Sequence, residues 1–221
     1  MRTEPSPGSS AEGRVRREAI VDAATARFVA AGYHRSPMAD IARDVGLSER
    51  GLLRYFPTKK HLLLAVAGRR FDFVNRWASE VPPSPDGLRA FHALMELSRR
   101  QLAQPGLIEL FVLVAAEAAD RSGPAHAIFS EQYDRGISEM TAFLMGGVAM
   151  GRLKPDVDYW AIARQSIAVA DGLQLQWVLS GGTLDLIGAL QFYVDQTTPL
   201  LTLPVAATAR ARRRPVTALS D

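Results

Sequence analysis

Cysteine is absent from the 221-residue sequence, which excludes disulfides, thiolate metal sites and cysteine nucleophiles. Long apolar runs are also missing. The longest one, residues 107–119, is interrupted by Glu109 and Glu117 and is too short to cross a bilayer. No apolar secretory segment follows Met1. We therefore expect a cytoplasmic protein with no membrane partner.

The short motifs of several enzyme classes are missing as well. The sequence has no Gly-rich phosphate loop after a strand, no HExxH and no GxSxG. Glu117, Asp120 and Glu131 are possible paired carboxylates, but charged residues on solvent-facing helix surfaces explain them better. The histidines show no metal-ligand spacing: His34, His61, His92 and His126. We therefore predict that the protein is not an enzyme and uses no metal or cofactor.

The net charge of +3 is small, but it is unevenly distributed. Residues 1–80 contain 14 Lys and Arg against 9 Asp and Glu, residues 81–203 contain 8 against 13, and residues 204–221 contain 4 against 1. A basic first part on an acidic second part suggests a polyanionic partner for the first part. An ordinary solvated surface also explains an excess of this size.

What the sequence does contain is helical periodicity. Apolar residues recur every three or four positions over 14–31, which predicts a helix that ends at Gly32. Ser36 and Pro37 predict the start of a second helix, because serine caps free backbone N–H groups and proline fits the first helical position. We read residues 1–13, rich in Pro, Ser and Gly, as a disordered leader.

The second helix is followed by signals for a tight turn and two more helices. Gly46 permits the sharp turn, and Ser48 can cap a third helix over residues 49–56 that ends before Pro57. Thr58 can cap a fourth helix. The first three helices therefore form a helix-turn-helix domain, which we place at residues 14–60.

The rest of the chain also reads as helix. The Pro-Pro-Ser-Pro run at 82–85 interrupts the helical pattern. Five helices are predicted after it, over residues 86–103, 106–121, 124–152, 157–180 and 183–203. No segment reads as a strand. We therefore predict an all-α fold with a helical bundle at residues 61–203 and a flexible basic tail at 204–221, for which an auxiliary DNA contact is possible and plain solubility is the simpler role.

Residues 32–62, GYHRSPMADIARDVGLSERGLLRYFPTKKHL, resemble the DNA-binding signature of the TetR family of regulators. The parts occur in order: Gly32-Tyr33, Ser36, Asp40-Ile41-Ala42, Val45-Gly46-Leu47-Ser48, Tyr55-Phe56, Lys59 and Leu62. Residues 171–177 are similar to the penultimate helix of one family subgroup. The resemblance implies a homodimeric repressor that binds a double-stranded, palindromic DNA operator and is released by a small-molecule effector.

The pattern also indicates which residues meet DNA. A helix braced by a second helix can enter the major groove and read base edges. The candidate readers on the third helix are Glu49, Arg50, Leu53 and Arg54. The two arginines suit bidentate bonds to guanine, and Leu53 suits a thymine methyl group. A solvated surface is the competing interpretation of both arginines.

Phosphate contacts need hydrogen-bond donors, and four residues are placed to supply them: Ser36, Ser48, Tyr55 and Lys59. The resemblance implies this role for Tyr55 and Lys59 in particular. Gly51 is also counted among the candidate DNA-binding residues. It departs from the family, which usually has Thr or Ser there, and it lowers helix propensity by about 1 kcal/mol relative to alanine. Arg14, Arg16 and Arg17 have two interpretations, a contact to the DNA backbone or minor groove and a charged helix start.

The bundle has more apolar residues than one buried face needs. The resemblance implies that helices 157–180 and 183–203, joined by a Gly181-Gly182 turn, pair with their copies in a dimer. Candidate effector-binding residues combine aromatic or apolar bodies with a few polar groups: Phe91, Met95, Phe111, Phe129, Tyr133, Gln165, Gln174 and Trp177. These residues can also be plain core. The alternative function is a helical protein-interaction module without sequence-specific DNA binding.

Overall fold

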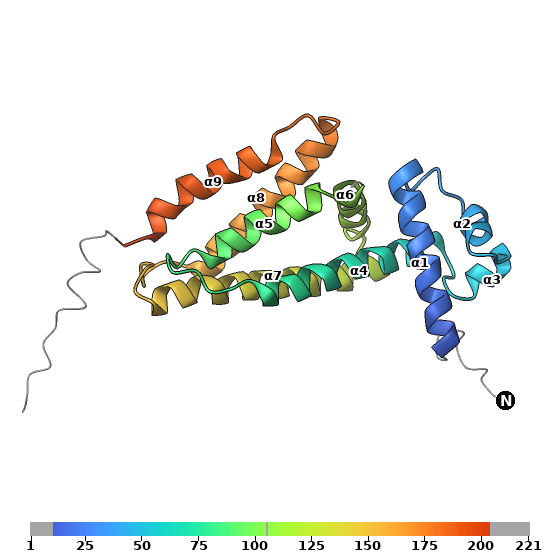
Figure 1. The fold of residues 1–221 in the computed structure, drawn as a ribbon, viewed down its shortest axis with the longest axis horizontal. Coiled ribbons are helices and arrows are strands. Elements are labelled where there is room, and N and C mark those ends of the chain that lie inside the picture. The colour runs from blue at the N-terminus through green and yellow to red at the C-terminus, as the bar shows by residue number, and fades with distance from the viewer. Residues whose placement is uncertain (1–10, 105, 204–221) are drawn as a thin grey trace, which may run out of the picture. The chain divides into compact units, whose positions relative to one another are not determined.

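The computed structural model describes residues 11–104 and 106–203, and for residues 70–80 and Pro124 it describes the backbone only. The regular elements in these ranges are all helices (Figure 1): α1 (Ala11–Ala31), α2 (Met38–Asp44), α3 (Glu49–Leu53), α4 (Lys59–Glu80), α5 (Arg89–Leu102), α6 (Leu107–Glu117), α7 (Pro124–Ala149), α8 (Tyr159–Leu179) and α9 (Leu186–Leu201). The all-α prediction is confirmed.

Two segments were predicted to be flexible, the leader at residues 1–13 and the basic tail at 204–221. Residues 11–13, predicted as part of a disordered leader, form the first turn of α1. The prediction was wrong there because it rested on the Pro, Ser and Gly content of the whole segment, whereas its last three residues belong to α1. The remainder of the leader, and the predicted basic tail at 204–221, lie outside the described residues.

The described chain divides into two compact units. Unit 1 contains residues up to 79 and residues 100–132, and unit 2 contains residues 80–99 and those from 133 on. This division differs from the predicted boundary after residue 60, because α6 packs on α1 in unit 1. Gly106 illustrates how close that packing is: a Cβ atom there would lie 2.9 Å from the Cα atom of Val29.

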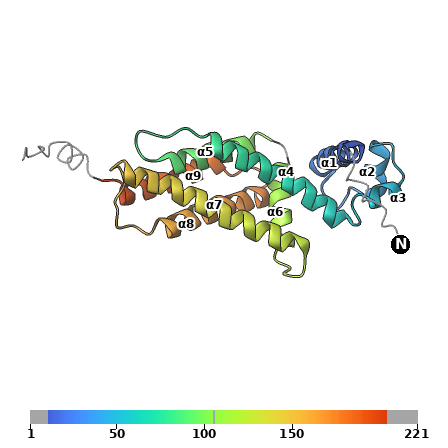
Figure 2. The same cartoon turned by 90° about the horizontal axis from the view of Figure 1, so that it is seen from below.

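Unit 1 brings α1, α2 and α3 together (Figures 1 and 2). The fully buried residues include Ile20 and Ala24 of α1, Ile41 of α2 and Leu52 of α3. These residues lie on the inward faces of their helices, and burial of those apolar faces drives the helices together.

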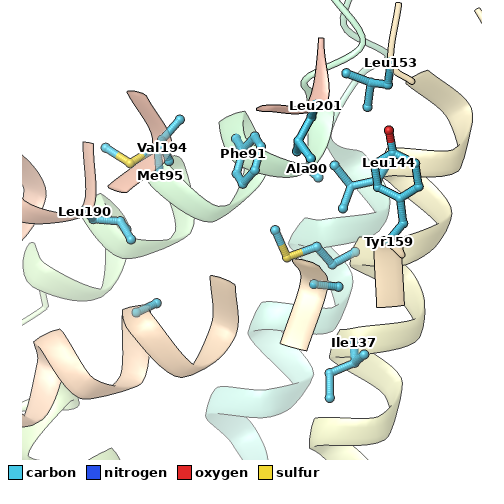
Figure 3. Packing of buried hydrophobic residues seen from close by; sticks show 13 residues of the cluster. Ala90, Phe91, Met95, Ile137, Leu144, Leu153, Tyr159, Leu190, Val194 and Leu201 are labelled. Atoms are coloured by element: carbon cyan, nitrogen blue, oxygen red, sulfur yellow. The ribbon is translucent and has the colours of Figure 1, made fainter. Parts of the chain in front are cut away.

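Unit 2 packs parts of α5 and α7 with α8 and α9 around a second apolar core (Figure 3). Phe91, Leu144 and Leu190 are completely buried in it. The helices α8 and α9 run antiparallel, because the residues before α8 pair with the end of α9: the Lys154 amide donates to the Leu201 carbonyl oxygen over 2.8 Å. The Gly181-Gly182 turn joins their other ends, as predicted, with φ of 64° and 83°.

Candidate DNA-binding surface

The turn before α3 and the start of α3 are built as the sequence predicts. Gly46 has φ of 67°, a conformation that glycine adopts without steric cost. The Ser48 side chain accepts a hydrogen bond from the Gly51 amide over 3.1 Å and caps the helix. Helix α3 ends at Leu53, three residues earlier than predicted.

Helix α3 is held by one side chain and presents the others to solvent. Leu52 is completely buried, whereas Leu53 is 38% exposed. Glu49, Arg50 and Arg54 are also exposed. Three of the four predicted readers therefore lie on the exposed surface of α3, and the fourth, Arg54, is the C-cap residue directly after it. Leu52 anchors the helix, and the arrangement is compatible with entry into a major groove.

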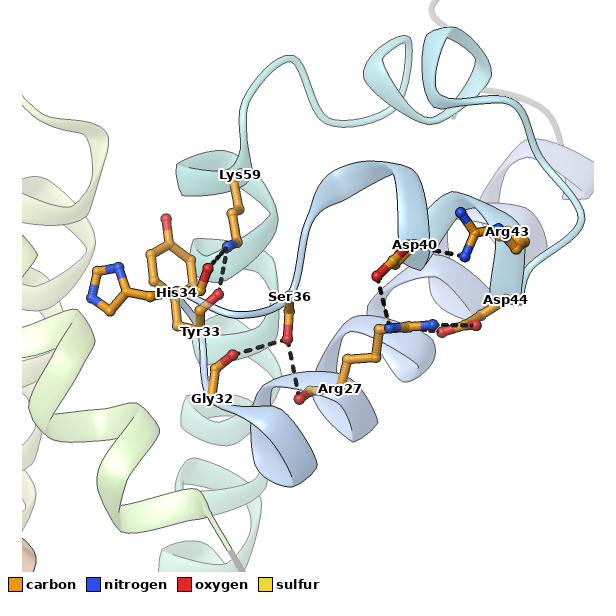
Figure 4. A network of polar contacts seen from close by, with 9 residues as sticks. All are labelled: Arg27, Gly32, Tyr33, His34, Ser36, Asp40, Arg43, Asp44 and Lys59. Carbon is orange, nitrogen blue, oxygen red and sulfur yellow. Dashed lines mark hydrogen bonds and ion pairs between the residues drawn. The ribbon is translucent and has the colours of Figure 1, made fainter.

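An ionic network fastens α2 to α1 (Figure 4). The Arg27 guanidinium on α1 donates from Nη2 to Asp44 Oδ1 over 2.9 Å and from Nη1 to Asp40 Oδ2 over 3.4 Å. Arg43 also bridges to Asp40, at 2.9 Å. The hydrogen bond from Arg27 holds the pKa of the Asp44 carboxyl below its ordinary value. This network was not predicted from the sequence, although two acids four residues apart on one helix were a visible signal.

The structure gives Ser36 a different role from the predicted one. It was predicted to cap α2 and to contact phosphate, but its side chain is completely buried. Its hydroxyl shares its hydrogen between the carbonyl oxygens of Gly32 and Arg27, at 2.9 and 3.2 Å (Figure 4). The N-cap of α2 is Pro37, which makes no side-chain bond. Ser36 therefore closes the turn after α1 and is not accessible to a phosphate group.

The side chain of Lys59, the first residue of α4, packs against the same turn. Its ammonium donates to the carbonyl oxygens of Tyr33 and His34 and lies 4.4 Å from the centroid of the Tyr33 ring (Figure 4). Partial burial lowers the pKa of Lys59 and raises the pKa of Tyr33. Lys59 is thereby fixed at the start of α4. Tyr55, the other residue predicted for phosphate, is half-buried just after α3.

The predicted effector residues fall in both units. In unit 1, Phe111 and the buried Phe129 stack with ring centroids 6.0 Å apart. The other six, Phe91, Met95, Tyr133, Gln165, Gln174 and Trp177, belong to unit 2. The structure therefore does not gather all eight into one cluster within a unit.

Two smaller groups do form in unit 2. The Tyr133 hydroxyl donates to Asp171 Oδ2 over 2.6 Å, and Gln174, one turn further along α8, is buried. Phe91 and Met95 line a half-open groove of about 360 Å³ between α5 and α9, together with Val194.

Gln165 differs from the prediction that placed it among apolar neighbours. It is exposed on α8, because the adjacent Ser166 occupies the buried face of the helix. Among the described residues, no helix combines the length and apolar character needed to cross a membrane, and no cluster of His, Asp and Glu is suited to a metal ion.

The sequence around these helices is similar to known proteins. The profile of the family described as "Bacterial regulatory proteins, tetR family" matches residues 20–66, which contain α2 and α3. The HTH-type transcriptional repressor KstR of Mycobacterium tuberculosis is 31% identical over 163 residues, which are 71% of this chain and 68% of the relative. The chain belongs to the TetR family. It is accordingly a DNA-binding transcriptional regulator.

Solved structures of TetR-like proteins share the fold. A transcriptional regulator from Saccharomonospora viridis in complex with choline is 24% identical, with a TM-score of 0.72 over 86% of this chain and 100% of that one. The regulator FadR of Bacillus subtilis in complex with stearoyl-CoA is 17% identical, with a TM-score of 0.66 over 80% of this chain and 95% of that one. At these identities the likeness shows the TetR fold and leaves the ligand of this chain open.

Proposed function

We propose that the protein is a homodimeric repressor that binds a palindromic operator through α3 and is released from it by a small, largely apolar ligand. The observation that carries the proposal is the short, capped α3, which exposes Glu49, Arg50 and Leu53 while Leu52 is buried, with the exposed Arg54 directly after it. The similarity to KstR, which is described as a repressor, supports repression over activation.

The proposed contacts divide into base readers and phosphate anchors. Arg50 and Arg54 donate to guanine, and Leu53 touches a thymine methyl group. Tyr55 and Lys59 donate to phosphates. Ser48 adds a third donor, because accepting the bond from the Gly51 amide uses an oxygen lone pair and leaves the hydroxyl hydrogen available.

The dimer proposal rests on apolar side chains that the single chain leaves uncovered on α8 and α9. Leu179 is 77% exposed and Phe192 is 67% exposed, and the exposed Leu175 lies one turn before Leu179 on the same face of α8. Apolar stripes of this kind on two adjacent helices are typical of an interface between protein subunits. A two-fold dimer presents two copies of α3 to two half-sites, which predicts a palindromic operator.

A matched pair of substitutions tests the dimer. Phe192→Gln removes an exposed ring from the proposed interface, and Met145→Gln removes a comparably apolar, 49% exposed side chain from α7. We expect Phe192→Gln to weaken self-association by about tenfold or more, as loss of an interface anchor does, and Met145→Gln to leave it unchanged. Light scattering of the full chain that shows a monomer at all concentrations would overturn the dimer.

The ligand proposal rests on unit 2. The Tyr133–Asp171 hydrogen bond and the buried Gln174 supply the few polar groups that orient a ligand, and neighbouring apolar side chains supply its contact surface. The complexes of similar folds with choline and with stearoyl-CoA support a small-molecule sensor. Trp177, which also belongs to unit 2, remains a candidate for the same role, whereas Phe111 and Phe129 form a separate candidate group within unit 1.

Selection from random DNA tests the proposed function as a whole. We expect an enriched inverted repeat with half-sites about 10 base pairs apart, or a multiple of that spacing. Arg54→Ala should cost about 1–3 kcal/mol and relax the preference at one position in each half-site. Arg99→Ala, which removes an exposed arginine from α5, is the control. If no sequence is enriched, the operator proposal fails.

A further inference from the structure

Arg17 lies in the first half of α1 but contacts the segment that follows α3. Its guanidinium carbon is 4.8 Å from the centroid of the Phe56 ring. Phe56 is almost completely buried and comes directly after Tyr55, whereas Arg17 is exposed. A cation stacked on an aromatic ring keeps its position without losing its contact with solvent. The α1 helix therefore brings a fixed positive charge to the end of the recognition helix.

Arg17 also differs in its partners from three other arginines of unit 1. Arg27, Arg43 and Arg69 each bind a carboxylate. No carboxylate pairs with Arg17 among the described residues, and the helix positions three and four residues away hold Gly, Arg, Ile and Val. Its charge is thus ordered by an aromatic ring, and no acid of the described part of the chain neutralises it.

We propose that Arg17 binds a phosphate of the DNA backbone beside the base pairs that α3 reads, with Phe56 holding the guanidinium in place. The inference rests on the DNA-binding role of α3. A guanidinium matches phosphate geometry with two parallel hydrogen bonds, and a side chain already fixed by stacking loses little conformational freedom on binding. Arg17 therefore extends the DNA-binding surface from α3 and the start of α4 onto α1.

Arg16 provides a matched control. It is exposed, carries the same charge and is adjacent on α1, but no ring contact holds it among the described residues. Arg17→Gln removes the charge, Arg17→Lys keeps the charge without the planar group, and Arg16→Gln removes a charge of equal sign one position away. Thermal unfolding of each variant measures whether the contact between Arg17 and the Phe56 ring affects stability.

The experiment measures affinity by fluorescence anisotropy at several salt concentrations, on the selected operator and on a random duplex. Loss of one phosphate contact lowers the slope of log K against log salt by about 0.9. We expect Arg17→Gln to show this change on both duplexes, with about tenfold weaker binding, the equivalent of one charge-assisted hydrogen bond. Arg17→Lys should retain the slope, and Arg16→Gln should resemble the wild type.

Two outcomes overturn the proposal. If Arg17→Gln keeps the wild-type slope, Arg17 serves only to cover Phe56, whatever happens to the melting temperature. If Arg16→Gln lowers the slope equally, the effect is a general one of charge and needs no stacking on Phe56. Because the random duplex reports phosphate contacts without an operator, this test stays separate from the selection experiment, whose failure would show only that the sequence preference is absent.

Discussion

At the scale of single residues, Leu52 and Leu53 separate stability from recognition. Leu52 is completely buried and Leu53 is 38% exposed on the same helix. Leu52→Ala should lower the free energy of unfolding by about 2–5 kcal/mol, because it removes buried methyl groups and leaves a cavity. Leu53→Ala should change it by less than about 0.5 kcal/mol and alter the selected DNA sequence. Chemical denaturation and selection from random DNA measure the two effects, and equal destabilisation by both variants would contradict this division.

Residue-scale prediction from the sequence worked where helical periodicity decides which side faces inward. The exposure of Glu49, Arg50 and Arg54 followed from that periodicity. It failed at Ser36, because serine before proline carries the same signal whether the hydroxyl caps the next helix or closes the previous turn. Only the three-dimensional path of the chain distinguishes a hydroxyl that reaches free N–H groups from one that reaches the carbonyl oxygens of Gly32 and Arg27.

At the scale of elements, Gly106 controls how α6 packs on α1. It has φ of 74°, and a Cβ atom would collide with the backbone of Val29. Gly106→Ala should cost about 1–2 kcal/mol from the left-handed conformation alone, and the collision adds to that cost. Gly68→Ala, at an open position inside α4, should instead stabilise the protein by about 0.5–1 kcal/mol. Equilibrium unfolding in urea distinguishes the signs, and a neutral Gly106→Ala would contradict the packing argument.

The ion pair between α1 and α2 makes a pH-dependent contribution to stability. Arg27 holds the pKa of Asp44 below its ordinary value of 3.8 in the folded state. A depressed folded pKa stabilises the protein above the unfolded pKa, and this stabilisation is lost as the pH falls through the folded pKa. Asp44→Asn should therefore lower the melting temperature at pH 7, and the difference from the wild type should shrink below about pH 4. A difference that stays constant down to pH 3 would exclude this linkage.

Element-scale prediction from the sequence was accurate for helix identity and weaker for helix ends and partners. Apolar periodicity and cap signals together predicted each helix that the structure describes. The predicted last helix continues through Pro199, and in the structure Pro199 lies inside the final turn of α9. Periodicity does not say which helices pack together, so the sequence did not predict that α6 belongs with α1 in unit 1.

At the scale of the whole molecule, a sensor requires that ligand and DNA act on one continuous structure. Helices α5 and α7 each contribute residues to both units. In unit 1, an ion pair between Lys60 and Glu117 ties the start of α4 to the end of α6. We therefore expect a rearrangement on binding of the proposed ligand to be transmitted along helices whose backbone belongs to both units.

Reciprocity is the strictest test of the proposed ligand response. A ligand that binds the DNA-free form about 5–150 times better contributes about 1–3 kcal/mol of coupling, and operator DNA must weaken that ligand by the same factor. A thermal-shift screen that begins with choline and stearoyl-CoA identifies a ligand, and calorimetry then measures its affinity with and without saturating operator. We expect operator DNA to lower the affinity for the ligand by the same factor by which the ligand lowers the affinity for operator DNA. Equal affinity in both states would mean that unit 2 binds the molecule without signalling, since a ligand with no preference between two states shifts neither of them.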